Sequence, residues 1–469
     1  MAYNLLIIMP DQLRADYLSC YGHPTIQTQH IDALSRQGVQ LNHCYCAAPL
    51  CGPSRISMVT STYVGEHNHR NYGSTISPDV PNLVCELKRN GYRTGMFGKN
   101  HMLTEERLEE VWDEMDNICL GNYDGHPDYL HSFTAFTLDK SHPYDITGRL
   151  TDETVDFIER TKQPFLAWVN YQDPHPAFCC PPPYDSMFDP ADIPLPPDWE
   201  VRDNGEPIRN EVWRRHSEME LCSEEDIKKA IAFYMGKVRY VDDCVGKLME
   251  TLKKCGKDKN TIVLFMADHG ELLGCRGMTH KLPAFYDCLT RIPVILYHPE
   301  RNWNGKCWDA LVEEVDITPT LLELLEISKP CSMVGHSFIR SLENGETVFR
   351  DSVLSEAGCG APTCREPIAG HKIKAPSNPT HYGAGAMVRR GAYKLSIYAD
   401  DHGELFDLEH DPLETENLYG NPQWAQIQNE MTLLLLKRVL SVKMREDAPY
   451  GVWNEAWGPI DPRGEPLEM

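Results

Sequence analysis

Apolar residues along the chain follow two patterns that predict strands and helices in turn. Short continuous apolar runs, which are typical of strands buried on both faces of a parallel sheet, lie at residues 4–9, 92–98, 164–171, 261–270 and 292–298. Between them, apolar residues recur at helical spacing with turn residues at the ends, at residues 28–38, 80–91 and 223–256. Strands that alternate with helices predict a mostly parallel sheet sandwiched by helices, an α/β fold.

The longest helical pattern has the clearest start signal. Ser223 and Asp226 resemble a capping box, and an apolar stripe follows at Val238, Val241, Val245, Leu248 and Leu252. We expect Asp242 and Asp243 on the solvated face of this helix. In the first predicted helix, Thr28 is the expected N-cap.

The pattern of predicted elements changes after about Asn344. Residues 386–411 predict two or three antiparallel strands joined by turns, and residues 426–440 predict a closing helix packed on them. We therefore predict a catalytic α/β domain over residues 1–345 and a smaller α+β domain with an antiparallel sheet over 346–469.

Composition and charge exclude several classes of partner. The formal net charge of −24 over 469 residues argues against nucleic acid or an anionic membrane, although clustered cations could still bind an anionic substrate. No apolar run reaches the roughly 18 residues of a membrane span. The first residues lack a basic segment and a cleavage site, so the 17 cysteines are expected to be reduced and the protein cytoplasmic.

Candidate chemistry follows the ends of the predicted strands, where open α/β sheets bind ligands. Asp11 and Gln12 follow the first strand, and Asp268 and His269 follow a later one. Their oxygen and nitrogen atoms suit a divalent ion such as Ca²⁺, Mg²⁺ or Mn²⁺, and the imidazole favours a transition metal somewhat.

Basic residues near the same strand ends could hold a tetrahedral anion. They are Arg55, Lys99, His101, His175 and Lys281. A metal ion together with ammonium and guanidinium groups stabilises charge on a transferring sulfuryl or phosphoryl group. Cys51 lies where such a reaction needs a nucleophile, at the start of a predicted short helix.

Several ordered motifs carry a family resemblance along most of the chain. "CGPSR" at residues 51–55 matches Cys-x-Pro-Ser-Arg, the signature of type I sulfatases. "IIMPDQLRAD", "GYRTGMFGKNHM", "DPHPAF" and "MADHGELLG…HK" resemble further motifs of that family, and "ELFDLEHDPLETENL" resembles its C-terminal sheet. The resemblance implies an alkaline-phosphatase-like α/β core with a small C-terminal domain, and a sulfuric ester hydrolase that cleaves a sulfate monoester.

The resemblance also implies roles for single residues. Cys51, converted to formylglycine by a formylglycine-generating or anaerobic sulfatase-maturing enzyme, would be nucleophile and metal ligand. The other ligands of one divalent metal would be Asp11, Gln12, Asp268 and His269. Arg55 and Lys99 would hold the aldehyde hydrate, and His101 would be the base when it collapses. His175 and Lys281, with Lys99, would bind the sulfate, and His175 or Lys281 would protonate the leaving group.

Two positions depart from the common family pattern. Gln12 and His269 stand where many sulfatases have aspartate and asparagine, and the pairing resembles choline sulfatases and phosphonate monoester hydrolases. Ca²⁺ is the expected metal, with Mn²⁺ or Mg²⁺ as alternatives, and a phosphonate monoester or phosphodiester is the alternative substrate. A site asparagine is expected at Asn68 or Asn71.

Other interpretations of these residues give different functions. Cys44, Cys46 and Cys51 could form a zinc cluster, His280 could contact substrate, and a chain that keeps Cys51 as a thiol would be a binding protein. Segments 102–164 and 179–213 are expected to shape the pocket, and the aromatic run at 450–462 is expected to pack in the core or wall the pocket. A small imported sulfate ester is the expected substrate, and a homo-oligomer is compatible with the sequence.

Overall fold

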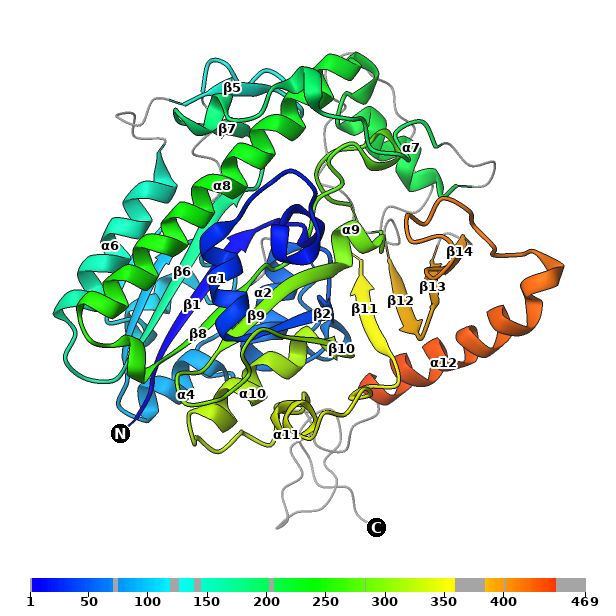
Figure 1. Ribbon diagram of the computed structural model, residues 1–469. Helices are drawn as coiled ribbons and strands as arrows, with labels where there is room; N and C mark the ends of the chain where they lie inside the picture. The colour runs from blue at the N-terminus through cyan, green and yellow to red at the C-terminus, as the bar shows by residue number, and fades with distance from the viewer. Residues whose placement is uncertain are drawn as a thin grey trace, which may run out of the picture.

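An eight-stranded mixed sheet forms the centre of the molecule (Figure 1). The computed structural model describes residues 2–70, 75–118, 126–138, 145–201, 206–282, 284–358, 384–399 and 402–443. In spatial order the strands are β10 (Lys306–Glu313), β2 (Val39–Tyr45), β9 (Arg291–Tyr297), β8 (Thr261–Met266), β1 (Asn4–Asp11), β6 (Phe165–Pro174), β3 (Arg93–Gly98) and β4 (Glu114–Asn117).

Strand β9 alone runs against the others in this sheet, because it pairs antiparallel with both β8 and β2. The remaining neighbours pair in parallel, as the sequence predicts. The five predicted strands are present as β1, β3, β6, β8 and β9. Strands β2, β4 and β10 were not predicted, because polar residues interrupt their apolar runs.

Helices cover both faces of the sheet, which confirms the predicted α/β sandwich. Alternate residues of β1 point to opposite sides, so Leu6 and Ile8 join one apolar core and Leu5 and Ile7 join the other. The first core is closed by α1 (Gln29–Gln37), α6 (Ile146–Arg160) and α8 (Glu224–Lys254). The second is closed by α2 (Cys51–Thr60), α4 (Leu83–Arg89), α10 (Ile317–Leu324) and α11 (Ile339–Glu343).

The capping box at Ser223 and Asp226 is confirmed at the start of α8. The prediction that Asp242 lies on a solvated face is wrong. Its carboxylate is buried and accepts the backbone N–H groups of His30 and Ile31 at 3.0 and 2.8 Å. Asp242 thereby caps α1 from a neighbouring helix, whereas the hydroxyl of Thr28 makes no cap bond and donates to Asp32.

A second sheet follows the central one. Its order is β11 (Val353–Ala357), β12 (Gly385–Arg390), β13 (Tyr393–Tyr398) and β14 (Gly403–Asp407), all antiparallel. Helix α12 (Ala425–Lys443) packs its Met431 and Leu435 on Leu395 and Leu405 of this sheet. The predicted antiparallel strands and closing helix are therefore confirmed. The boundary at residue 345 remains a prediction, and the aromatic run at 450–462 lies outside the described residues.

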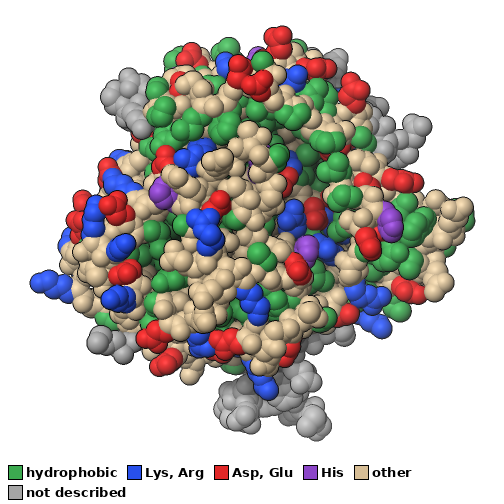
Figure 2. Space-filling view, in the orientation of Figure 1, with side chains coloured by type: hydrophobic (Ala, Val, Ile, Leu, Met, Phe, Trp, Pro, Cys, Tyr) green, Lys and Arg blue, Asp and Glu red, His purple; other side chains and the backbone are tan. Residues whose placement is uncertain are grey.

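Short elements complete the described chain. They are α3 (Val64–His67), α5 (Leu108–Val111), α7 (Ile208–His216), α9 (Asp287–Thr290) and a two-stranded parallel sheet of β5 (Ala135–Thr137) and β7 (Phe178–Cys180). Within the described part of the chain, every helix is too short or too polar to cross a membrane. Acidic and basic side chains are interspersed on the face seen in Figure 2.

Candidate active site

Two strand ends and one helix start meet at a buried cluster of groups that could hold a metal ion. Ligand atoms of Asp11, Cys51, Asp268 and His269 all lie within 4.8 Å of one another, and all four residues are buried. Asp11 ends β1, Asp268 and His269 follow β8, and Cys51 is the first residue of α2. The structure thus brings together side chains that lie more than 250 residues apart in the sequence.

Cys51 contacts two of these groups directly. Its Sγ lies 3.1 Å from Nε2 of His269 and 3.6 Å from Oδ1 of Asp11. His269 Nδ1 lies 2.9 Å from the carbonyl oxygen of Gly270, which can only accept, so Nδ1 carries the proton and Nε2 offers its lone pair to the cluster. Burial and Asp11 oppose ionisation of the Cys51 thiol, but Lys281, Lys99 and His269 lower its pKa well below the usual value.

Arg55 is wholly buried and forms an ion pair with Asp268, the second carboxylate of the cluster. Its Nε lies 2.9 Å from Oδ2 of Asp268, and its Nη1 donates to Oδ1 of Asn170 at 2.8 Å and to the carbonyl of Lys99 at 3.0 Å. Its Nη2 has no hydrogen-bond partner among the described residues. Asp268 Oδ1 accepts the backbone N–H of Gln12 at 3.0 Å, which orients this carboxylate toward the cluster.

Lys99 forms a buried ion pair with Asp11. Burial opposes the charge on Asp11, yet Lys99, His175 and Lys281 keep the pKa of this carboxyl well below its usual value. Gly98, just before Lys99, has a φ of +115°, and a Cβ there would lie 2.0 Å from the carbonyl oxygen of Asn170. A glycine is therefore required at the point where β3 delivers Lys99 to the site.

Gln12 links the end of β1 to the segment that follows β8. Its Oε1 accepts from Lys281 Nζ, and its Nε2 donates to Oε2 of Glu271. Its backbone has a φ of +67°, in the left-handed region that a glutamine rarely adopts. Burial opposes the ammonium charge of Lys281, but Cys51, Asp11 and Asp268 raise its pKa.

Two predicted imidazoles border the cluster. His175 follows β6, and its Nδ1 donates to the carbonyl of Pro176, which leaves Nε2 as the outward nitrogen. Burial, Lys281 and Lys99 lower the pKa of His175 well below its usual value, although Asp11 opposes this. Burial also lowers the pKa of His101, and a hydrogen bond with Cys51 partly offsets the effect. Both shifts favour neutral imidazoles.

Glu314 anchors the start of α2 and was not predicted from the sequence. Its Oε2 accepts the backbone N–H of Ala47 at 2.9 Å, and its Oε1 lies 2.6 Å from Oγ of Ser54. Ser54 Oγ also lies 2.7 Å from the carbonyl oxygen of Asp268. The hydroxyl has one proton, so Glu314 is the donor whenever Ser54 donates to Asp268. Burial raises the pKa of Glu314 well above its usual value, in keeping with a protonated carboxyl.

The other candidate residues have structural partners. His280 Nε2 bonds the carbonyl of Ser132 at 3.0 Å, and its ring lies 6.4 Å from that of His175. Asn68 is exposed at the end of α3 and accepts from Arg70, and Asn71 lies outside the described residues. In the described part of the chain, the metal-type cluster around Cys51 contains neither Cys44 nor Cys46, which disfavours a cysteine-based zinc site.

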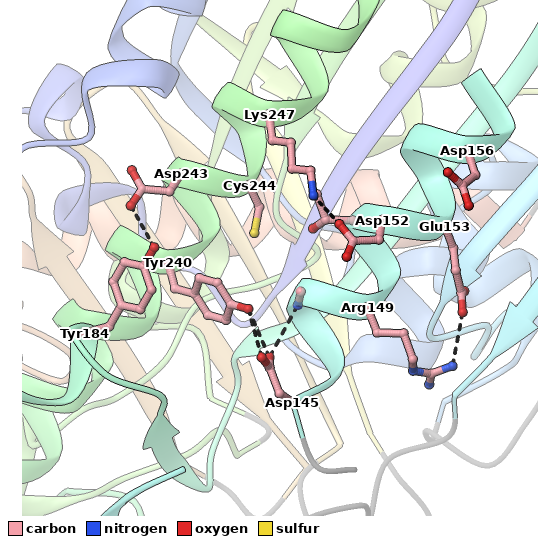
Figure 3. Close-up of a pocket in the computed structure, with 12 residues that line it drawn as sticks. Asp145, Arg149, Asp152, Glu153, Asp156, Tyr184, Tyr240, Asp243, Cys244 and Lys247 are labelled. Atoms are coloured by element: carbon pink, nitrogen blue, oxygen red, sulfur yellow. Dashed lines mark hydrogen bonds and ion pairs between the residues drawn. The ribbon is translucent and has the colours of Figure 1, made fainter. Parts of the chain in front are cut away.

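A groove of about 890 Å³ between α6 and α8 lies apart from this cluster (Figure 3). Its charged and phenolic groups bond to one another, in the pairs Asp145–Tyr240, Asp152–Lys247, Glu153–Arg149 and Asp243–Tyr184. Because most of its charged groups are paired with one another, the buried cluster at Cys51 is the better candidate for chemistry.

The donor set at the cluster fits a divalent cation. Two carboxylates and one imidazole with its lone pair directed inward are ligands that such ions accept. Nη2 of Arg55 adds a buried donor that has no partner among the residues described, and an anionic ligand could accept its hydrogen bond.

Comparisons with known proteins identify the family of the chain. A family model described as Sulfatase matches residues 3–327. An arylsulfatase of Clostridium perfringens is 26% identical over 489 residues, covering 94% of this chain and 95% of that enzyme.

Solved structures share the fold. BT4656, in complex with its substrate D-glucosamine-2-N,6-O-disulfate, has a TM-score of 0.77 at 20% identity and covers 96% of this chain and 100% of its own. A phosphonate monoester hydrolase of Agrobacterium radiobacter has a TM-score of 0.76 at 23% identity, covering 100% of this chain and 99% of that chain.

The fold is that of the alkaline-phosphatase-like enzymes. The chain belongs to the sulfatase family, and its activity is that of a sulfuric ester hydrolase. The family and the fold expected from the motifs are confirmed.

Proposed function

We propose that this sulfatase cleaves a sulfate monoester with a formylglycine made from Cys51 and one divalent cation. The observation that carries the proposal is the position of Cys51 Sγ, buried within 4.8 Å of ligand atoms of Asp11, Asp268 and His269. A nucleophile at this position would act beside the metal and beside two buried cations, Arg55 and Lys99.

Asp11, Gln12, Asp268 and His269 would hold the cation together with the modified Cys51. Ca²⁺ is our first assignment, because the carboxylate and amide oxygens are hard ligands, and Mn²⁺ or Mg²⁺ are the alternatives. Such a cation supplies positive charge against the charge that develops on the sulfuryl oxygens. The hydrated aldehyde of formylglycine supplies an attacking hydroxyl and a second hydroxyl through which the aldehyde re-forms.

The remaining residues would orient the reactants and move protons. Arg55 and Lys99 fix the two carboxylates and leave positive charge at the nucleophile. Lys281 and His175 would bind the sulfate group, and one of them would protonate the departing alkoxide. His101, whose neutral form is favoured, would take the proton when the aldehyde re-forms.

The first test is mass spectrometry of the tryptic peptide Gln37–Arg55 from the native host. Conversion of Cys51 to formylglycine removes H₂S and adds one oxygen atom. The peptide also contains Cys44 and Cys46, so fragment ions must assign the change to position 51. A Cys46→Ser variant should still be converted, and a Cys51→Ala variant should not. A native peptide carrying only the thiol at position 51 would refute the formylglycine proposal.

A phosphonate monoester or phosphodiester is the alternative substrate, and Gln12 and His269 favour it as the residues that depart from the common sulfatase pattern. Initial rates on aryl sulfate and aryl phosphonate esters of the same phenol decide between them. A higher kcat/KM for the sulfate supports the proposal, and a higher value for the phosphonate supports the alternative.

The partners of the protein remain proposals as well. A formylglycine-generating or anaerobic maturing enzyme would modify Cys51, and co-expression with each in turn would show which one does. A cytoplasmic location and a small substrate rest on the sequence, and cell fractionation tests the location. Size-exclusion chromatography with light scattering tests for a homo-oligomer.

A further inference from the structure

One buried lysine of α8 holds the loop that carries His175. Lys237 has no exposed surface, although a lysine is among the residues least often buried. Its Nζ lies 3.0 Å from Oδ1 of Asp173 and donates to the carbonyl oxygens of Ala177, at 2.7 Å, and of His175. The ammonium group therefore contacts alternate residues on both sides of His175.

These contacts give hydrogen-bond or ion-pair partners to two carbonyl groups and one carboxylate of the loop, which would be costly to bury without them. A buried carbonyl without a donor costs free energy, and an ammonium group offers three N–H donors. Asp173 has a second partner, because its Oδ2 accepts from Oγ1 of Thr147 on α6 at 2.7 Å. The loop is thus tied to α8 and α6 at the point where it leaves β6.

The orientation of the His175 ring depends on this loop. Its Nδ1 donates to the carbonyl of Pro176, the residue between the two carbonyls that Lys237 holds. If these carbonyls moved, the acceptor for Nδ1 would move with them, and Nε2 would lose its direction. Lys237 can therefore influence His175 without contacting the sulfuryl group.

We propose that Lys237 is a positioning residue for His175. It fixes the 173–177 loop so that Nε2 of His175 faces the cluster of Cys51 and Lys281. The inference rests on the proposed function in one respect, that His175 contacts the transferring group. It differs from a plain structural role, because its effect on turnover must pass through the imidazole.

A double-mutant cycle separates these roles. Lys237→Met alone would leave the carboxylate of Asp173 buried and unpaired, so the test variant is Lys237→Met with Asp173→Asn. It is measured with and without His175→Ala. Lys247→Met is the matched control, because Lys247 lies on the same helix in an exposed ion pair with Asp152.

We expect the test variant to lower kcat/KM roughly 10- to 100-fold, because a small displacement of a catalytic group has effects of this size. In the His175→Ala background the same variant should change kcat/KM by less than about twofold, since the group being positioned is gone. The control should match the wild type. An equal loss in both backgrounds would overturn the proposal.

Crystal structures of the test variant and the wild type give a readout independent of activity. A displaced 173–177 loop or a rotated His175 ring supports the inference, and an unchanged loop refutes it. If the wild-type protein hydrolyses no sulfate ester, the proposed function fails. The loop comparison then still decides whether Lys237 positions His175.

Discussion

Nε2 of His269 lies 3.1 Å from Sγ of Cys51, and the bond from Nδ1 of the same ring to the carbonyl of Gly270 fixes its direction. This relationship joins the end of β8 to the start of α2. It places a lone pair and a thiol at one buried point, between the carboxylates of Asp11 and Asp268. The geometry suits metal binding better than a thiol–imidazole pair alone, because two carboxylates and an imidazole lone pair directed to one point are ligands that a divalent cation accepts.

Removing the bound cation should therefore destabilise the protein. We expect EDTA to lower the melting temperature and Ca²⁺, Mn²⁺ or Mg²⁺ to restore it, with about 2.7 kcal/mol gained at a hundredfold excess over Kd. Differential scanning fluorimetry with metal analysis measures the effect for each ion. His269→Ala should lose most of the metal-dependent shift. An identical shift in that variant would show that the ion binds elsewhere.

Asp268→Asn should be strongly destabilising. The change leaves the guanidinium of Arg55 buried without its carboxylate, and breaking a buried ion pair in this way costs about 3–5 kcal/mol. Urea unfolding monitored by tryptophan fluorescence measures the loss. Asp152→Asn, which removes an exposed pair with Lys247, should change stability little. Equal effects of the two substitutions would contradict the role of burial.

Asp242→Ala should weaken the start of α1. Two backbone N–H groups, of His30 and Ile31, lose their acceptor, and a cost of about 1–3 kcal/mol is expected. Asp243→Ala is the matched control, because the carboxylate of Asp243 is half-buried and caps no helix end among the described residues. Hydrogen exchange at residues 30 and 31 should speed up in the first variant only. Unchanged exchange there would exclude the cap across the two helices.

Stability should fall in acid partly through His67. Burial, with His69 and Arg70 nearby, lowers its pKa to about 3, and its Nδ1 accepts the backbone N–H of His69 at 3.0 Å. The folded pKa lies below the unfolded value near 6.5, so this contribution is present above pH 6.5 and is lost as the pH falls below it.

The His67→Gln variant isolates that contribution. A glutamine amide can still donate to Ser57, which lies 2.9 Å from Nε2 of the imidazole, but it does not titrate. Between pH 7.5 and 5, the free energy of unfolding of the wild type should drop by about 2 kcal/mol more than that of the variant. Parallel curves for the two proteins would contradict the assignment.

The sequence predicts the central sheet well where strands are buried on both faces. It misses β2 and β10 because Asn42, His43 and Asp309 break their apolar runs near the edge of the sheet. The pattern of apolar residues does not predict the direction of β9 either, since hydrophobic periodicity does not tell parallel strands from antiparallel ones. Topology depends on contacts between distant segments, which local spacing does not encode.

In the candidate site too, local sequence patterns predict some residues, and contacts between distant segments determine the others. Polar residues at strand ends locate Asp11, Lys99 and Asp268, because the ends of parallel strands meet at one edge. The supporting residues Asn170, Glu314 and Lys237 were missed, since each finds its partner far away in the chain. For Asn170, the available signal was a polar residue within the apolar run of β6.

Tyr234 and Lys237 lie about one turn apart on α8, and each holds a different strand end. The Tyr234 hydroxyl donates to the carbonyl of Gln12 at 2.8 Å and accepts from the backbone N–H of Arg14 at 3.0 Å, while Lys237 holds the loop of His175. The spacing of these two residues on the helix therefore relates the position of Gln12, a proposed metal ligand, to that of His175, which we propose binds the sulfate group. Inserting one residue between Tyr234 and Lys237 would rotate one side chain by about 100° around the helix axis relative to the other. The three-residue spacing on α8 therefore sets the distance between the segment of Gln12 and the loop of His175.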